Sequence, residues 1–139
     1  MNGALALAVS LGIVASFDDL RRRHIANWIT AGGFAASVLY HAVTGGWMGL
    51  AQSLEGAAAG FGVLLVFVVL GGMGTGDLKL STAFGALLGP KGILLAALLT
   101  APLGGLMAGL MLAFRWRTRA IPYAPAIAIG AWLALLGQK

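Results

Sequence analysis

Cysteine is absent from this chain of 139 residues, and charged side chains are scarce. Without a thiol there is no disulfide, no cysteine nucleophile and no thiolate ligand for a metal. Charged residues make up 9% of the sequence, whereas soluble domains carry roughly a quarter. Hydrophobic residues make up 60%. This balance excludes a water-soluble fold and predicts an integral membrane protein.

Regular alternation of apolar and polar residues is also missing, which argues against a transmembrane β-barrel. Backbone polar groups in lipid then have to be paired within helices. A spanning helix needs about 20 apolar residues, so about six spans would nearly fill the chain. We therefore expect an all-α polytopic membrane protein whose residues 1–139 form one membrane-embedded domain.

Six apolar stretches, separated by short links, are the expected helices. They comprise residues 4–17, 28–43, 54–70, 78–88, 93–114 and a last stretch from near 121 to 136. The fourth is the shortest and, at about 1.5 Å per residue, covers only ~17 Å of a hydrocarbon core about 30 Å thick. We therefore expect the glycine-rich turn before it to lie within the membrane as well.

The basic residues predict the orientation of these helices. Two of the nine, Lys91 and Lys139, belong to one side of the membrane. The other seven lie beside the links that follow the first, third and fifth stretches: Arg21, Arg22, Arg23, Lys79, Arg115, Arg117 and Arg119. The positive-inside rule places these seven in the cytoplasm and the N-terminus outside. Topology thus explains the net charge of +5 without a nucleic-acid partner.

Only four acidic residues are present, and three of them lie on the predicted cytoplasmic side. Asp18 and Asp19 follow the first stretch, and Asp77 lies in GGMGTGDLKL between the third and fourth. Two carboxylates held close together resist double ionisation and can share one proton. One of them can then take a proton from water while the other polarises a peptide carbonyl. Such a site needs no metal and no cofactor.

Structural roles for the same residues stay open. Asp77 can be the N-cap of the fourth helix, as Asn27 can be that of the second. Lys79 either biases the local field at a carboxylate or only anchors the topology. Gly74 and Gly76 permit backbone conformations that other residues avoid, and they would let an extended substrate approach closely.

Three segments resemble the type IV prepilin peptidase family. GMGTGDLKL resembles its GxGD motif, DLRRRHIANW its upstream aspartate motif, and IPYAPAIAIGAW the pattern of its final helix. The resemblance covers nearly the whole chain and implies that Asp19 and Asp77 are catalytic aspartates, with Asn27, Gly74, Gly76 and Lys79 in supporting positions. Two departures stand out: Ala26 replaces the proline usual in the family, and Asp18 beside Asp19 is an alternative catalytic residue.

The resemblance implies an aspartyl protease of the bacterial inner membrane. Such an enzyme removes the short basic leader of a type IV or Flp-type prepilin on the cytoplasmic side. Longer relatives also carry a four-cysteine zinc domain and methylate the new N-terminus. This chain resembles the minimal, peptidase-only form of tight-adherence pilus systems, so we expect neither that domain nor methylation.

Two other classes compete with a peptidase. A small proton-coupled transporter or channel would be expected to place an ionisable group near the membrane midplane. Here three acids lie on one side and Glu55 lies near the other, which disfavours transport. An inactive peptidase-like subunit is the third possibility, and the retained aspartates count against it.

Overall fold

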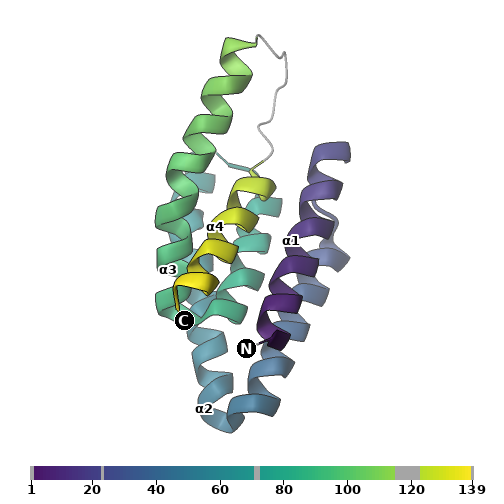
Figure 1. Cartoon of the computed structure of the whole chain (residues 1–139), viewed down its shortest axis with the longest axis vertical. Coiled ribbons are helices and arrows are strands. Elements are labelled where there is room, and N and C mark those ends of the chain that lie inside the picture. The colour runs from purple at the N-terminus through teal and green to yellow at the C-terminus, as the bar shows by residue number, and fades with distance from the viewer. Residues whose placement is uncertain (1, 23, 71–72, 115–122, 139) are drawn as a thin grey trace.

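The computed structural model describes residues 2–22, 24–70, 73–114 and 123–138. Its elements are α1 (Asn2–Arg22), α2 (Asn27–Val69), α3 (Thr75–Ala113) and α4 (Ala124–Gly137), and the described residues contain no strand (Figure 1). Three of these helices are long and apolar enough to cross a membrane, over Gly3–Arg22, Asn27–Val69 and Thr75–Met107. The prediction of an all-α fold is confirmed.

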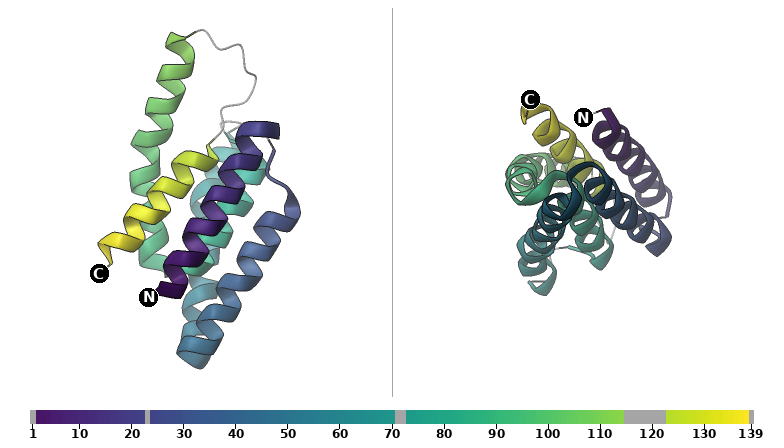
Figure 2. Two further views of the ribbon diagram at one scale, coloured as in Figure 1. Left: turned by 45° about the vertical axis from the view of Figure 1, so that its right-hand side comes forward. Right: turned by 90° about the horizontal axis from the view of Figure 1, so that it is seen from below.

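Each of the two long helices is interrupted by one glycine. Gly46 in α2 has φ 57° and ψ −142°, and Gly89 in α3 has φ 75° and ψ 176°. Glycine adopts positive φ without the steric cost that a side chain brings. Pro90 follows Gly89 and lacks the N–H that would continue the preceding helix. Both helices turn back at these points (Figures 1 and 2).

The interruptions divide α2 into a first arm (27–45) and a second arm (47–69), and α3 into an inner arm (75–88) and an outer arm (90–113). Together with α1 and α4, the described chain has six helical segments in the order expected from the sequence. Both interruptions lie in or beside the expected links, TGGWMG and GPKG.

The helix ends differ from the sequence predictions. The first helix was expected to end near residue 17, but α1 continues to Arg22 and includes both Asp18 and Asp19. Hydropathy marks the apolar part of a helix, whereas backbone hydrogen bonds extend beyond it. Arg21 and Arg22 in the last turn also favour this extension through the helix dipole. The fourth helix likewise begins earlier than expected, at Thr75.

The inner arm of α3 is the centre of the bundle. The largest fully buried apolar side chains, Phe84, Leu80 and Leu87, all belong to it. The second arm of α2 packs closely against it, because Gly56 lies against the carbonyl of Gly85. Small residues that let two backbones approach are typical of helix packing in lipid. Asp77 lies in the first turn of this central arm.

Interhelical hydrogen bonds reinforce this packing. The Ser53 hydroxyl donates to the carbonyl of Ala86 at 2.8 Å, which ties α2 to α3. Trp132 in α4 donates its indole N–H to the carbonyl of Ala8 in α1 at 2.8 Å. Figure 2 shows α1 and α4 side by side at one edge of the bundle.

Five helix ends meet at one end of the bundle, called here the site end. These are the end of α1, both ends of α2, and the starts of α3 and α4 (Figure 1). The start of α1, the end of α4 and the bends at which α2 and α3 turn back lie toward the opposite end. Residues distant in sequence are thus brought together at the site end.

We predict opposite effects for two Gly→Ala substitutions in the second arm of α2. A methyl group at Gly56 would overlap the backbone of Gly85, while one at Gly62 meets nothing within 4 Å. Overpacking costs typically about 1–3 kcal/mol, whereas alanine is favoured over glycine in an open helix by about 1 kcal/mol. Thermal unfolding in detergent should therefore show Gly56→Ala destabilised and Gly62→Ala unchanged or stabilised. Equal shifts of the same sign would contradict the close packing.

Candidate active site

Asp19 and Asp77 are the buried charged side chains of the described chain, with exposed fractions of 6% and 8%. Asp19 lies in the last turns of α1, and Asp77 lies in the first turn of α3. Helices α1 and α3 contact each other, and the charge of Asp19 acts on the carboxyl group of Asp77. The structure therefore brings together the two residues that the sequence analysis predicted as a pair.

Asp19 is held by the start of α4. The amide N–H of Ala124, the first residue of that helix, donates to Asp19 Oδ2 at 3.2 Å. The first N–H groups of a helix have no partner within the helix, and the positive end of its dipole favours a negative charge. This hydrogen bond offsets part of the cost of burying the carboxylate and leaves Oδ1 for another contact.

Asp77 is held by the start of its own helix. The N-cap of α3 is Gly74, and no side chain caps it. The interpretation of Asp77 as the N-cap is therefore wrong: it occupies the third helical position, where an acidic group is favoured by the helix dipole. Its Oδ2 lies 3.8 Å from the point that a Cβ on Gly74 would occupy. Both carboxylates thus lie at helix N-termini.

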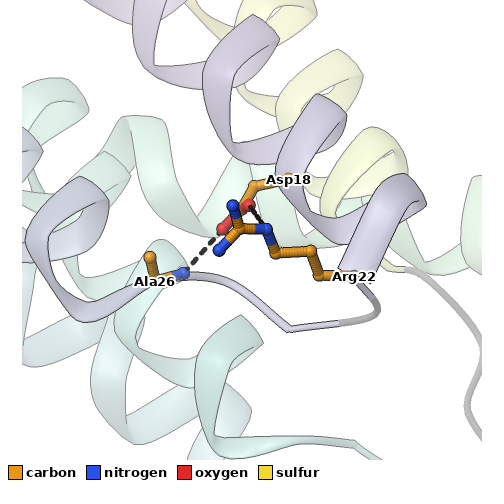
Figure 3. A network of polar contacts seen from close by, with 3 residues as sticks. All are labelled: Asp18, Arg22 and Ala26. Atoms are coloured by element: carbon orange, nitrogen blue, oxygen red, sulfur yellow. Dashed lines mark hydrogen bonds and ion pairs between the residues drawn. The ribbon is translucent and has the colours of Figure 1, made fainter.

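Asp18 points elsewhere and stabilises the turn between α1 and α2 (Figure 3). Its Oδ2 accepts a hydrogen bond from the amide N–H of Ala26 at 2.9 Å, and its Oδ1 lies 3.4 Å from Nε of Arg22. Successive residues on a helix point about 100° apart, so only one of two neighbouring aspartates faces the bundle. The geometry favours Asp19 over Asp18 as the site residue.

The same hydrogen bond connects the two departures from the family pattern. A proline in place of Ala26 would have no N–H to donate to Asp18. The backbone of Ala26, with φ −62° and ψ 138°, is otherwise one that proline adopts readily. Alanine at this position therefore supplies the donor that Asp18 uses.

Lys79 and Asn27 contact each other rather than the carboxylates. Lys79 Nζ donates to Asn27 Oδ1 at 2.8 Å and links the start of α3 to the start of α2. The prediction that Asn27 caps the second helix is wrong: Ala26 is the N-cap, without a side-chain hydrogen bond. The single ion pair among the described residues joins Arg22 to Asp18, so Lys79 is paired with neither buried aspartate.

The glycines of the motif have neither unusual backbone angles nor unusually close neighbours. Gly74 is extended, with φ −80° and ψ 157°, a conformation open to any residue. In the described chain only Gly46 and Gly89 have positive φ, so the expected special conformations at Gly74 and Gly76 are not found. A Cβ on Gly76 would lie 3.5 Å from that of Ile25, an ordinary contact.

The sequence analysis did not predict the amide of Ala124 as part of the site. A backbone donor has no residue signature, and the only signal was the IPYAP segment that opens the last helix. The described residues contain no group of three or more histidine, aspartate or glutamate side chains that could bind a metal. Arg23 and residues 115–122, which include three of the predicted cytoplasmic arginines, lie outside the described chain.

Fold and site together define an all-helical protein of membrane character with two buried aspartates at one end of its bundle. The chain belongs to the type IV leader peptidase family, whose sequence model matches residues 6–110. The resemblance seen in the motifs is thereby confirmed.

Three curated relatives illustrate the similarity, and each is named prepilin leader peptidase/N-methyltransferase. That of Aeromonas hydrophila is 34% identical over 141 aligned positions, which cover 94% of this chain and 48% of the relative. That of Bacillus subtilis strain 168 is 42% identical over 87 positions, covering 60% and 35%. That of Xanthomonas campestris pv. campestris is 36% identical over 107 positions, covering 63% and 37%. The chain thus spans about half the length of the Aeromonas relative. No solved structure matches it.

The hydrogen bond between Ala26 and Asp18 can be tested by a double-mutant cycle. Hydrogen bonds to charged groups contribute about 1.5–3 kcal/mol, and partial exposure of Asp18 reduces this to roughly 1 kcal/mol. Ala26→Pro should therefore lower the free energy of unfolding by roughly 1 kcal/mol more when Asp18 is present than in an Asp18→Ala background. Unfolding free energies in detergent measure the coupling. Additive effects would show that the hydrogen bond contributes nothing.

Proposed function

We propose that this protein is a prepilin leader peptidase. It hydrolyses the peptide bond between the short basic leader and the apolar N-terminal helix of a type IV or Flp-type prepilin. The observation that carries the proposal is the burial of Asp19 and Asp77 together at one end of an apolar bundle. Membership of the leader peptidase family, and the names of the relatives, support the same activity.

The reaction follows aspartyl chemistry. Two neighbouring carboxylates share one proton, because a second negative charge at short range is unfavourable. The ionised aspartate takes a proton from water, and the resulting hydroxide adds to the carbonyl carbon of the scissile bond. The protonated aspartate donates to the carbonyl oxygen, and a proton then passes to the leaving nitrogen. The amide of Ala124 holds the carboxylate of Asp19 in place during these transfers.

The proposed mechanism uses no metal and no cofactor. In the described chain, no group of three or more histidine, aspartate or glutamate side chains is arranged to hold a metal ion. We also propose that this polypeptide does not methylate its product, because its residues include no cysteine for the four-cysteine zinc site of longer relatives.

We further propose that all six helical segments span the inner membrane of a bacterium. The N-terminus lies outside, and the active site lies at the cytoplasmic boundary. Support comes from the basic residues: Arg21 and Arg22 are in the last turn of α1 and Lys79 is near the start of α3, all at the site end. Lys91 follows the Gly89 interruption at the opposite end. This asymmetry fits the positive-inside rule.

A proton-coupled carrier is less consistent with this geometry. Such a carrier would be expected to hold an ionisable group near the midplane, between two gates. In the described part of the chain both buried carboxylates lie at the site end instead. Glu55, in the second arm of α2, is exposed.

Cleavage of a prepilin from the same genome tests the proposed function. We expect Asp19→Asn and Asp77→Asn each to lower the cleavage rate by at least about 100-fold, the scale of lost general acid–base catalysis. Asp18→Asn should retain most activity, because Asp18 contacts the turn and not the pair. The assay is the mobility shift of the prepilin on co-expression, at equal enzyme levels. Full cleavage by both the Asp19 and Asp77 variants would contradict the mechanism.

The state of the product N-terminus is a separate prediction. Purified enzyme supplied with S-adenosylmethionine should release pilin with an unmodified α-amine, which intact mass spectrometry would detect. A mass increase of one methyl group, absent without the methyl donor, would show that this polypeptide methylates despite having no cysteine.

A further inference from the structure

An apolar cavity of about 310 Å³ lies between helices of the bundle, and neither Asp19 nor Asp77 belongs to its wall. Its wall is formed by the second arm of α2, both arms of α3, α4, and the residues Met73 and Tyr123. Two of the three hydroxyl-bearing side chains in the wall are bonded to backbone: Ser81 donates to the carbonyl of Gly60 at 3.1 Å, and Thr100 to that of Ala96 at 2.7 Å; the third is Tyr123. Walls of this kind favour an apolar occupant over water.

Two residues connect the cavity to the carboxylates. Ser81 follows Asp77 by four positions on the inner arm of α3, so the two lie on one face of the helix, about one turn or ~5.4 Å apart. Tyr123 immediately precedes Ala124, whose amide donates to Asp19. The cavity therefore begins about one helical turn from the pair.

One side of the cavity reaches the surface of the bundle. Phe67 in its wall is 50% exposed, and Ala101 and Gly105 of the outer arm are also exposed. A methyl group on Gly105 would meet nothing within 4 Å. The opening lies between apolar helices, where the surface would face lipid, so a membrane-embedded chain can enter it from the side.

We propose that this cavity, called here the apolar subsite, binds a large apolar side chain of the substrate just after the scissile bond. The proposal rests on the proposed function. In that function the leader lies on the aqueous side and the apolar helix in the bilayer, so the residues after the bond pass the carboxylates on their way into the membrane. An engineered cavity of about 150 Å³ binds benzene, so the present volume admits an aromatic or long aliphatic side chain. When the substrate side chain occupies the apolar subsite, the scissile bond lies over Asp19 and Asp77.

The test combines subsite-filling variants with two substrates. Ala101→Phe narrows the opening and Ala97→Phe fills the interior, because both alanines belong to the wall. Ala58→Phe is the matched control, since Ala58 is exposed on the second arm of α2 and outside the wall. The substrates are a prepilin with a large apolar residue just after the cleaved bond and the same prepilin with alanine there. Melting temperatures in detergent show which variants fold.

For the large-residue substrate, we expect Ala101→Phe to lower kcat/KM at least tenfold, chiefly by raising KM. The loss should be less than threefold for the alanine substrate, and Ala58→Phe should act like wild type on both. Ala97→Phe should also lower kcat/KM more for the large-residue substrate than for the alanine substrate, and the difference between the two substrates should be larger than with Ala101→Phe. An equal loss on both substrates, or no loss on either, in the folded variants would overturn the proposal.

Two further results distinguish failure of the peptidase activity from failure of the apolar subsite alone. If wild-type enzyme cleaves neither substrate, the proposed function fails and the apolar subsite fails with it. A lipid chain in the cavity would give a different pattern. The melting temperature of the wild type would depend on lipid chain length, and Ala101→Phe would remove that dependence. Cleavage of both substrates by Ala101→Phe would be unchanged. That result would overturn the proposal and leave the peptidase activity intact.

Discussion

The burial of two carboxyl groups in an apolar bundle is the constraint on which the rest of this structure depends. An isolated carboxylate in such surroundings is costly unless it is hydrogen-bonded or compensated. Here the compensation comes from helix N-termini: the amide of Ala124 at the start of α4 contacts Asp19, and Asp77 lies in the first turn of α3. The end of α1 and the starts of α3 and α4 therefore have to meet at one end of the bundle. The reversals at Gly46 and Gly89 make that meeting possible.

Contacts around the pair hold this arrangement together. Asp18 secures the turn after α1 through the amide of Ala26, and the hydrogen bond from Lys79 to Asn27 joins α2 to α3. Close packing of Gly56 against Gly85 keeps the inner arm of α3 in the centre of the bundle. The carboxylates are thus positioned by helices rather than by a mobile loop, and the apolar cavity begins one turn below them.

The sequence predicted the helical class and the two chain reversals correctly, because apolar runs and glycine-rich links report directly on helices in lipid. It predicted the helix ends less well: Asp19 lies within α1 and not in a link, since hydropathy does not record where backbone hydrogen bonding stops. The choice of Asp19 over Asp18 agrees with the inward direction of its side chain, while the catalytic roles stay a prediction. The Ala124 amide and the cavity depend on contacts between residues far apart in the chain, which spacing alone does not reveal.

The absence of cysteine permits the most direct test of the central claim, that Asp19 and Asp77 share one site. Cysteine would be introduced at positions 19 and 77 together, and at 18 and 77 as the matched control. A short bifunctional thiol reagent would then be applied in detergent, and internal cross-linking scored by mass spectrometry. The account predicts efficient cross-linking of the 19/77 pair and little of the 18/77 pair. Cross-linking of 18/77 alone, or of neither pair, would contradict a shared site built from Asp19 and Asp77.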